Sequence, residues 1–175
     1  MRRARAAALA QVVSEELGSE PPPSSEAQVR HATEADLPRI VELLTQLSLE
    51  EAREELGPPL PEAYRRAFQQ IEADSNQRLL VAEAGGRVVG TASLLIVPNL
   101  SHRGRPYAVV ENVVVDATER GAGYGELLLR HAMEEARRAG CYKLSLTSNK
   151  RRTDAHRFYG RLGFRATHEG FRVEF

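Results

Sequence analysis

Residues 111–129, Glu-Asn-Val-Val-Val-Asp-Ala-Thr-Glu-Arg-Gly-Ala-Gly-Tyr-Gly-Glu-Leu-Leu-Leu, are the stretch from which the fold can be worked out. Its β-branched run predicts a strand, its glycines predict a tight turn, and the leucines that follow open a helix. Glycines at such a turn let main-chain N–H groups converge without interference from a Cβ atom, at a helix N-terminus that carries partial positive charge. The stretch therefore predicts a cradle for a diphosphate.

The spacing of these glycines argues against the two common nucleotide-binding loops. A dinucleotide fingerprint needs glycines at its first, third and sixth positions, and the sixth position counted from Gly121 is Glu126. The next predicted strand ends in small hydroxyl residues rather than in the acidic residue that would bind a ribose. A Walker A loop needs Gly-Lys-Ser/Thr, which does not occur in the chain. The cradle therefore belongs to another kind of ligand.

Arg120, Gly123 and Gly125 give the pattern Arg-x-x-Gly-x-Gly, which resembles the acyl-coenzyme A loop of the Gcn5-related N-acetyltransferase (GNAT) superfamily. Residues 155–159 (Ala-His-Arg-Phe-Tyr) and 162–164 (Leu-Gly-Phe) are similar to the last conserved segment of that superfamily. The resemblance covers about residues 29–175. Within it, residues 149–151 (Asn-Lys-Arg) together with residues 154–159 look particularly like aminoalkylphosphonate N-acetyltransferases.

The resemblance implies acetyl-coenzyme A as co-substrate, with its diphosphate in the loop and its pantetheine arm beside the preceding strand. The arm would pair as an added strand with the main chain of Val113, Val114 and Val115. An amide there would also stabilise the tetrahedral oxyanion. Asn149 is expected to contact the same arm. The residues expected to hold the diphosphate are Arg120, Gly121, Ala122, Gly123, Tyr124 and Gly125.

The pattern of apolar and turn residues predicts an α/β domain. Together with the resemblance, it indicates a mixed, mostly antiparallel central sheet of about six to seven strands flanked by about four helices. A parallel unit is expected from strand 107–115, helix 123–139 and strand 143–147. The other predicted elements are an edge strand at 29–32, a helix capped by Thr33 and Asp36, helices at 61–71 and 154–162, a hairpin of 78–83 and 87–96 across Gly85-Gly86, and two strands after Gly163. The domain is expected to span residues 28–175, after an extension, residues 1–27, that is flexible or partly helical.

Composition argues against several functional classes. The 24 Lys and Arg residues balance the 24 Asp and Glu residues, which disfavours a nucleic-acid binder that relies on bulk electrostatics. No apolar run reaches the length of a membrane span. The single cysteine, Cys141, rules out an internal disulfide and fits a reducing cytoplasm, and the histidines lack metal-ligand spacing. We expect a cytoplasmic protein without a metal, nucleic-acid or membrane partner; whether it is a monomer or a homodimer stays open.

Glu111 interrupts an otherwise apolar strand, where an unpaired carboxylate is costly and needs a partner or a task. Members of the superfamily often carry a carboxylate here that acts, directly or through water, as the base toward the amine. Freeing an alkylammonium of pKa about 10 at neutral pH costs about 4 kcal/mol, so the chemistry needs a base. Strand alternation predicts that Glu111 shares a face with Val109, Val113 and Val115, and that Asn112 lies on the other face. The alternative is a structural carboxylate bonded to a neighbouring strand or loop.

Tyr159 resembles the tyrosine that meets the thioester sulfur in this superfamily. Full proton transfer from a phenol of pKa about 10 to a thiolate of about 8.5 is uphill by roughly 2 kcal/mol, so we expect a hydrogen bond to the departing sulfur. The alternative is core packing, because Tyr159 lies on an ordinary apolar helical stripe. Nothing near Cys141 predicts a lowered thiol pKa. Direct transfer within a ternary complex is therefore the simpler mechanism.

The acceptor side is expected at residues 49–64 and 98–107. The first region carries acidic residues that would attract a cationic amine, and the second carries basic residues that would hold a phosphonate or carboxylate, although simple solvation is the commoner explanation. These residues are Glu50, Glu51, Glu54 and Glu55, and His102, Arg103 and Arg105. We expect a small primary amine, with an aminoalkylphosphonate as the specific hypothesis. Acetylation of a protein N-terminus or lysine, and a non-catalytic acyl-coenzyme A sensor, stay open, although a pure sensor needs neither Glu111 nor Tyr159.

Overall fold

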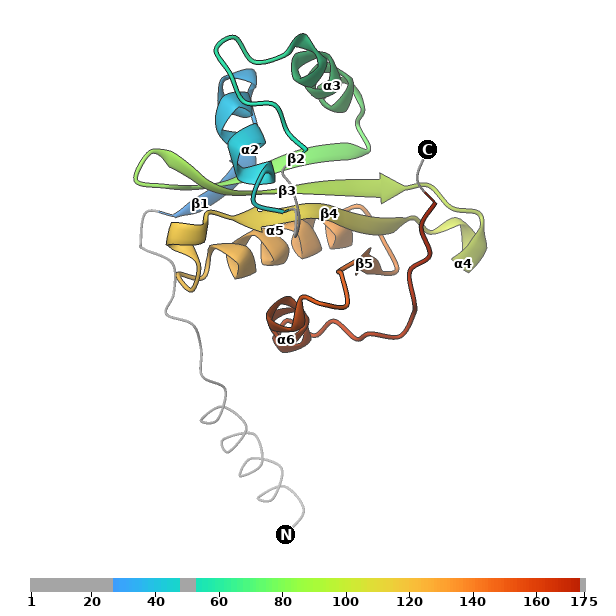
Figure 1. Cartoon of the computed structure of the whole chain (residues 1–175). Coiled ribbons are helices and arrows are strands. Elements are labelled where there is room, and N and C mark those ends of the chain that lie inside the picture. The colour runs from blue at the N-terminus through green and yellow to red at the C-terminus, as the bar shows by residue number, and fades with distance from the viewer. Residues whose placement is uncertain (1–26, 48–52, 174–175) are drawn as a thin grey trace.

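The protein is described by a computed structural model over residues 27–47 and 53–173, and it has the predicted α/β architecture (Figure 1). A sheet with the order β1-β2-β3-β4-β5 is antiparallel as far as β4 and parallel between β4 and β5. Its strands are β1 (Gln28–His31), β2 (Gln77–Ala84), β3 (Arg87–Val97), β4 (Tyr107–Val115) and β5 (Leu144–Leu146). The helices are η1 (Glu34–Asp36), α2 (Leu37–Leu44), α3 (Glu62–Ala73), α4 (Ser101–Gly104), η2 (Ala117–Glu119), α5 (Tyr124–Arg138) and α6 (Thr153–Arg161).

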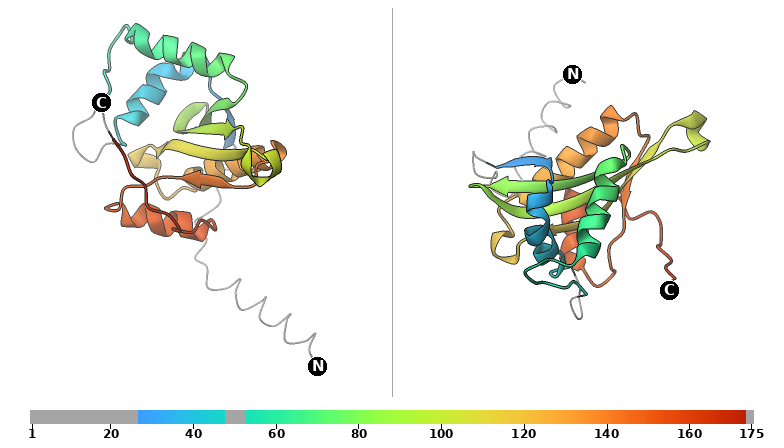
Figure 2. Two further views of the ribbon diagram at one scale, coloured as in Figure 1. Left: turned by 90° about the vertical axis from the view of Figure 1, so that its right-hand side faces the viewer. Right: turned by 90° about the horizontal axis from the view of Figure 1, so that it is seen from above.

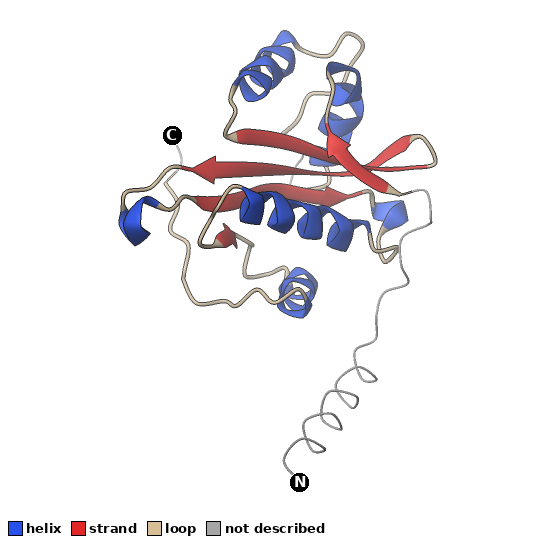
Figure 3. Cartoon of the chain, turned by 180° about the vertical axis from the view of Figure 1, so that it is seen from behind, coloured by secondary structure: helices blue, strands red, loops and turns tan. Residues whose placement is uncertain are grey.

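Helices cover both faces of the sheet. α2 and α3 lie over one face, while α5 runs along the other with α6 beyond it (Figures 2 and 3). On the α5 side, Leu80, Leu94, Leu128 and Leu129 are fully buried in the larger core cluster. A smaller cluster under α2 contains Leu43, which is also fully buried. No helix in residues 27–47 and 53–173 is both long and apolar enough to cross a bilayer.

Local sequence explains where the elements begin and end. The main-chain N–H of Thr33 donates to Asp36 Oδ2 at 2.7 Å, which confirms the predicted cap before α2. The hairpin between β2 and β3 turns at Gly85 and Gly86, which have φ values of 54° and 72°. α5 ends at Arg138 with Ala139 as its C-cap, and the φ of 75° at Gly140 suits the residue that follows the cap of a helix.

The two strands predicted after Gly163 are absent from residues 164–173, which is why the described sheet has five strands rather than six or seven. Phe164 packs on Tyr159, but residues 165–173 are all exposed, with Phe171 and Val173 at 93% and 73%, so this part of the segment buries no apolar face. Without that burial, a strand at the margin of a sheet gains little from pairing.

A β-bulge in β4 is the feature of the sheet that most affects the site. Ser93 of β3 is opposite Glu111 and Thr91 is opposite Val114, so the single residue between them on β3 faces two residues on β4. The extra residue, Asn112, has a φ of 54°, in the left-handed region that asparagine tolerates better than most residues. Because β4 has one extra residue here, the side chains after the bulge point to the opposite faces from those that simple alternation along the strand would give.

The prediction that Glu111 shares a face with Val113 and Val115 is therefore wrong. Val110 and, beyond the bulge, Val113 and Val115 all pack in the cluster beside α5. Glu111 follows Val110 directly, so alternation directs it to the α2 side. The bulge explains how two residues, Val110 and Val113, can be three positions apart and still face the same way.

Candidate active site

An opening in the sheet begins at the bulge. β5 pairs with β4 only from Ala108 to Val110, opposite Leu144 to Leu146. From Glu111 to Val115, no strand in the described residues pairs with β4 on the β5 side. This stretch offers main-chain N–H and C=O groups to an extended ligand, which is the arrangement expected for residues 113–115.

The loop after β4 is shaped as an anion cradle. Gly121 and Gly123 have φ values of 84° and 83°, and Gly123 caps α5. No atom lies within 4 Å of the position that a Cβ would take at Gly121, so the main chain there is open to a ligand. The side chain of Tyr124 is only 7% exposed, so Tyr124, like Ala122, has mainly its main chain to offer a diphosphate. The loop fits the phosphate groups of a thioester carrier.

Arg120 holds the cradle to the strand. Its Nε donates to Val115 O at 3.3 Å, so the side chain folds back over the turn. Direct contact between Arg120 and a diphosphate stays a prediction.

Asp116 and Arg39 anchor the same loop, and the sequence analysis missed both. Asp116 Oδ1 accepts from Thr118 N at 2.9 Å, and Asp116 also forms an ion pair with Arg39 of α2. Arg39 Nε donates to Val88 O at 3.1 Å. The hydrogen bonds from Thr118, followed by the pair with Arg39, lower the pKa of Asp116 to about 2. Arg39 thus joins α2, β3 and the cradle.

Glu111 lies at the bulge with no partner for its carboxylate. It is partly buried, and desolvation raises its pKa above the ordinary 4.5. No hydrogen bond or ion pair to this carboxylate is found within the part of the chain that the structure describes. The alternative of a carboxylate bonded to a neighbouring strand or loop therefore has no support here. A carboxylate with a raised pKa suits a general base.

Tyr159 approaches the opening from α6. Its ring packs against Phe158 and Phe164, with centroids 5.4 and 5.9 Å apart, so the predicted packing role is present. The hydroxyl has no hydrogen-bond partner among the described residues. Burial raises the pKa of Tyr159; the positive charge of Arg152 opposes this shift, and the negative charge of Glu111 adds to it. Glu111 and Tyr159 are therefore close enough to interact electrostatically.

Asn149 and Ser148 follow β5 beside α6. Asn149 Oδ1 accepts from Arg151 N at 2.9 Å, which leaves the amide nitrogen available to a ligand. His156 Nε2 lies 3.0 Å from Asn149 O, which agrees with a structural rather than a catalytic role for this histidine. Ser148 Oγ is buried without a hydrogen-bond partner in the structure, and the sequence analysis did not single it out. A buried hydroxyl of this kind is expected to bind a ligand or water.

The predicted basic acceptor residues lie elsewhere, near the end of α5. Arg105 donates to Gly140 O and Cys141 O at 3.4 Å, and the ring of His102 stacks on Tyr142 with centroids 3.7 Å apart. Arg105 is six residues from Glu111 along a mostly extended chain, about 20 Å. Burial raises the pKa of Cys141, which argues against a reactive thiolate.

The acidic residues expected on the acceptor side are only partly described. Glu54 Oε2 accepts from the hydroxyl of Tyr64 at 3.0 Å. Glu50 and Glu51 fall outside the described residues.

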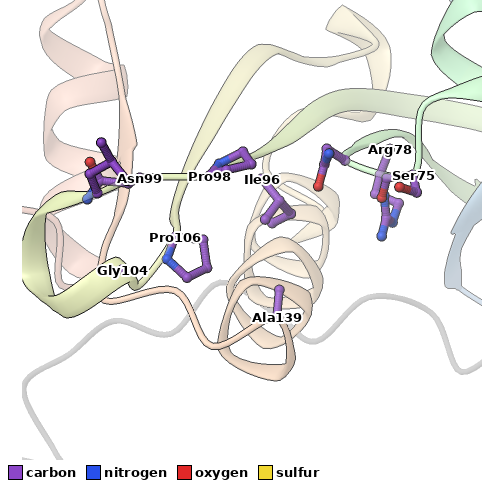
Figure 4. A pocket seen from close by; sticks show the side chains of 10 residues that line it. Ser75, Arg78, Ile96, Pro98, Asn99, Gly104, Pro106 and Ala139 are labelled. Carbon is purple, nitrogen blue, oxygen red and sulfur yellow. The ribbon is translucent and has the colours of Figure 1, made fainter.

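A hollow of about 650 Å³ lies near the end of α5, beside the loop that carries Arg105 (Figure 4). Its apolar walls are formed by Ile96, Pro98, Pro106 and Ala139, and Asn99 lies at its margin. Neither Glu111 nor Tyr159 lines it. The opening beside β4 and this hollow are therefore separate features, and the two predicted catalytic residues do not line the hollow.

Comparisons with known proteins agree with this geometry. The sequence model of the acetyltransferase (GNAT) family matches residues 42–164. The glucosamine 6-phosphate N-acetyltransferase of Trypanosoma brucei brucei is 36% identical over 149 residues, covering 84% of this chain and 95% of that protein. The aminoalkylphosphonate N-acetyltransferase of Salmonella typhimurium is 35% identical, covering 82% of this chain and 88% of that protein. The crystal structure of a protein from Bacillus halodurans C-125, described as a transcriptional regulator, superposes with a TM-score of 0.81 at 40% identity, covering 85% of this chain and 99% of that one.

Proposed function

The chain belongs to the GNAT family of acetyltransferases and is an acyl-coenzyme A-dependent N-acetyltransferase; from that premise we propose that its acceptor is a small primary amine that carries a phosphate or phosphonate group. The two curated relatives are named for glucosamine 6-phosphate and for aminoalkylphosphonates. Both kinds of molecule combine an amine with a phosphorus oxyanion. An aminoalkylphosphonate remains the specific hypothesis.

One observation carries the proposal that transfer is direct: the carboxylate of Glu111 and the hydroxyl of Tyr159 have no hydrogen-bond partners among the described residues. We place both groups at the opening, because the charge of Glu111 adds to the effect of burial in raising the pKa of Tyr159. Glu111, directly or through water, takes the proton of the acceptor amine as its nitrogen attacks the acetyl carbonyl. The desolvated carboxylate is a stronger base than an exposed glutamate. Tyr159 donates a hydrogen bond to the sulfur that leaves as coenzyme A.

The remaining predicted residues bind the donor, acetyl-coenzyme A. The main chain of 113–115 is free of a strand partner on the β5 side and would pair with the pantetheine arm. The glycines of the loop and the N-terminus of α5 would hold the diphosphate. The amide of Asn149 would contact the arm.

The experiment is a thiol-release assay with acetyl-coenzyme A and four acceptors. These are 2-aminoethylphosphonate, glucosamine 6-phosphate, ethanolamine and an amine-bearing peptide. The proposal expects kcat/KM to be highest for one of the first two. Faster acetylation of the peptide would reject the small phosphorus-containing acceptor in favour of a protein substrate.

The described role of the Bacillus halodurans neighbour is the one observation that favours a second candidate, a sensor that binds acyl-coenzyme A without transferring the acetyl group. Calorimetric binding of acetyl-coenzyme A with no turnover of any of the four acceptors would support that candidate. Turnover of any one of them excludes it.

A further inference from the structure

The loop that joins β4 to α5 buries little of its surface. Glu119 N donates to Asp116 O at 2.9 Å, which closes the short turn η2 within the loop. A segment with few packed side chains depends on polar contacts with the rest of the protein to keep one shape. The exposed residues of the loop are Ala117, Thr118, Arg120 and Gly121.

Arg39 of α2 supplies two such contacts at the start of the loop. Its guanidinium forms an ion pair with Asp116, whose side chain is 13% exposed, and its Nε donates to Val88 O at 3.1 Å. The other carboxylate oxygen of Asp116 accepts from Thr118 N at 2.9 Å. Arg39 therefore holds the carboxylate that shapes η2 and fixes it against β3.

Gln46, in the turn after α2, supplies a further contact. Its Oε1 accepts from Ala117 N at 2.8 Å. The main-chain N–H of the preceding residue, Asp116, donates to Val89 O at 2.9 Å. Side chains from α2 and from the turn after it thus act on two consecutive residues, at the point where the loop leaves the sheet.

The other end of the loop is held by the core. Tyr124 begins α5 and is only 7% exposed, and Leu128, one turn later, is fully buried. The anion cradle, residues 120–125, therefore lies between a packed helix and the two residues that Arg39 and Gln46 hold. N–H donors that already converge bind an anion more tightly than donors that must first be ordered, because less conformational entropy is lost on binding.

We propose that Arg39 and Gln46 are positioning residues for the donor: by fixing residues 116–117, they set the main-chain N–H groups of the cradle before the diphosphate of coenzyme A arrives. This inference rests on the proposed function, which gives the cradle this ligand. Both residues act through the loop and not by contact with the ligand. In this way α2 contributes to donor binding, although it covers the opposite face of the sheet from α5.

The test measures the Kd of coenzyme A by calorimetry, with no acceptor present. Arg39→Met and Gln46→Met are each expected to raise this Kd about tenfold, because the loop is no longer preorganised. Since Gln46 is neutral, a raised Kd in Gln46→Met cannot come from a change of charge. Gln46→Met removes a single hydrogen bond to the loop, so it is the variant that decides if Arg39→Met fails to fold.

Arg30→Met is the matched control. Arg30 also links separate elements through ion pairs, with Asp36 and Glu83 at 2.7 Å each, but none of these residues belongs to the loop. The control variant is expected to have a lower Tm and a Kd for coenzyme A within about twofold of the wild type. If Arg30→Met raises the Kd as much as the two test variants do, the effect follows general stability and the positioning role is wrong.

A shortened donor gives a readout that a loss of stability would not change selectively. S-acetylpantetheine keeps the thioester and the arm of acetyl-coenzyme A but lacks the diphosphate. In a thiol-release assay, Arg39→Met and Gln46→Met should raise the KM for acetyl-coenzyme A, whereas kcat/KM for S-acetylpantetheine should stay within about threefold of the wild type. Equal losses with the two donors, or an unchanged Kd of coenzyme A in both variants, would overturn the assignment.

The binding measurement also separates this inference from the proposed acceptor. If the enzyme turns over none of the four acceptors, and yet the two variants raise the Kd of coenzyme A as expected, the proposed acceptor is wrong and the positioning role stands. If the wild type does not bind coenzyme A, the proposed donor and the positioning role both fail.

Discussion

The ring of Phe158 lies 3.3 Å from the position that a Cβ atom would occupy at Gly125. Cγ2 of Val115 lies 3.7 Å from the same point. The start of α5, the end of β4 and the middle of α6 therefore meet where a side chain as small as alanine is crowded. Since Tyr159 follows Phe158, the position of the phenol depends on this contact.

Gly125→Ala is expected to lower the free energy of unfolding by about 1 kcal/mol. Overpacking costs about 1–3 kcal/mol, and the better helix propensity of alanine returns up to about 1 kcal/mol. Phe158 cannot move freely, because Tyr159 and Arg161 both contact its ring. Chemical denaturation would measure the change, and kcat should fall as Tyr159 is displaced.

Two controls identify the contact as the cause. In a Phe158→Leu background the ring is gone, so the effect of Gly125→Ala on stability should reverse in sign. Gly160→Ala, in α6 with no atom within 4 Å of its Cβ position, should be stabilising. If Gly125→Ala and Gly160→Ala stabilise the wild type equally, then Phe158 moves aside from the new Cβ atom at no cost in free energy, and the expected destabilisation is wrong.

Glu111→Gln is expected to lower kcat/KM about 10²- to 10⁴-fold, the usual contribution of a general base. In the wild type, kcat/KM should fall as pH drops through the pKa of Glu111, which burial places above 4.5. The variant should lack this acidic limb, while the limb set by ionisation of the amine remains. Glu72→Gln removes an exposed carboxylate of α3 and serves as the control. An unchanged pH–rate profile in Glu111→Gln would rule out the base.

The same substitution is expected to stabilise the protein near neutral pH. The pKa of Glu111 is higher in the folded state, so its ionised form is penalised by folding. That penalty is present above the folded pKa and disappears as pH falls below the unfolded value of about 4.5. Thermal unfolding should therefore show a higher Tm for Glu111→Gln at pH 7 and no difference near pH 4. A lower Tm at pH 7 would mean that the carboxylate has a stabilising partner.

Tyr159→Phe separates chemistry from packing. The variant keeps the ring contacts with Phe158 and Phe164 and removes a hydroxyl that has no partner in the described structure. We expect kcat to fall about 10- to 100-fold and the free energy of unfolding to change by less than about 0.5 kcal/mol. Tyr159→Ala, which also loses the ring, should be destabilised as well. Reduced stability with normal turnover in Tyr159→Phe would assign the residue to packing alone.

Substitutions at Asn112 test whether the β-bulge shapes the donor site. Asn112→Gly should be neutral or stabilising, because glycine adopts a φ of 54° without strain. Asn112→Val should cost about 1–2 kcal/mol of stability and raise KM for acetyl-coenzyme A as β4 shifts. His102→Val introduces a similar strain at a φ of 53° far from the opening, so it should lose stability without this change in KM. If both valine variants keep the wild-type KM, the bulge does not shape the donor site.

Much of the fold follows from local pattern. The bounds of strand 107–115 are correct at both ends, because its apolar run begins at Tyr107 and stops before Asp116. The bulge was not predicted, since alternation assumes one residue per position and Asn112 was the only sign of an exception. The strands after Gly163 were predicted from residue type, whereas their absence reflects exposure, which depends on the rest of the fold.

The candidate site likewise combines residues that local sequence predicts with features that depend on the three-dimensional fold. Glu111, Tyr159 and the glycine loop were predicted from the chain alone, because residue type and spacing carry their chemistry, and their roles stay predictions. The basic residues of 102–105 lie near the end of α5, which the sequence of a loop does not reveal, and their role toward the acceptor stays a prediction.

The unpaired stretch of β4 also bears on how the protein avoids self-association. An exposed edge strand has unpaired main-chain N–H and C=O groups that can pair with another polypeptide, which promotes aggregation. Here the bare margin is bounded at one end by Val110 pairing with Leu146, and Phe158 packs against the start of α5 near the other end. A ligand seated along residues 111–115 would occupy these main-chain groups and so deny them to another polypeptide.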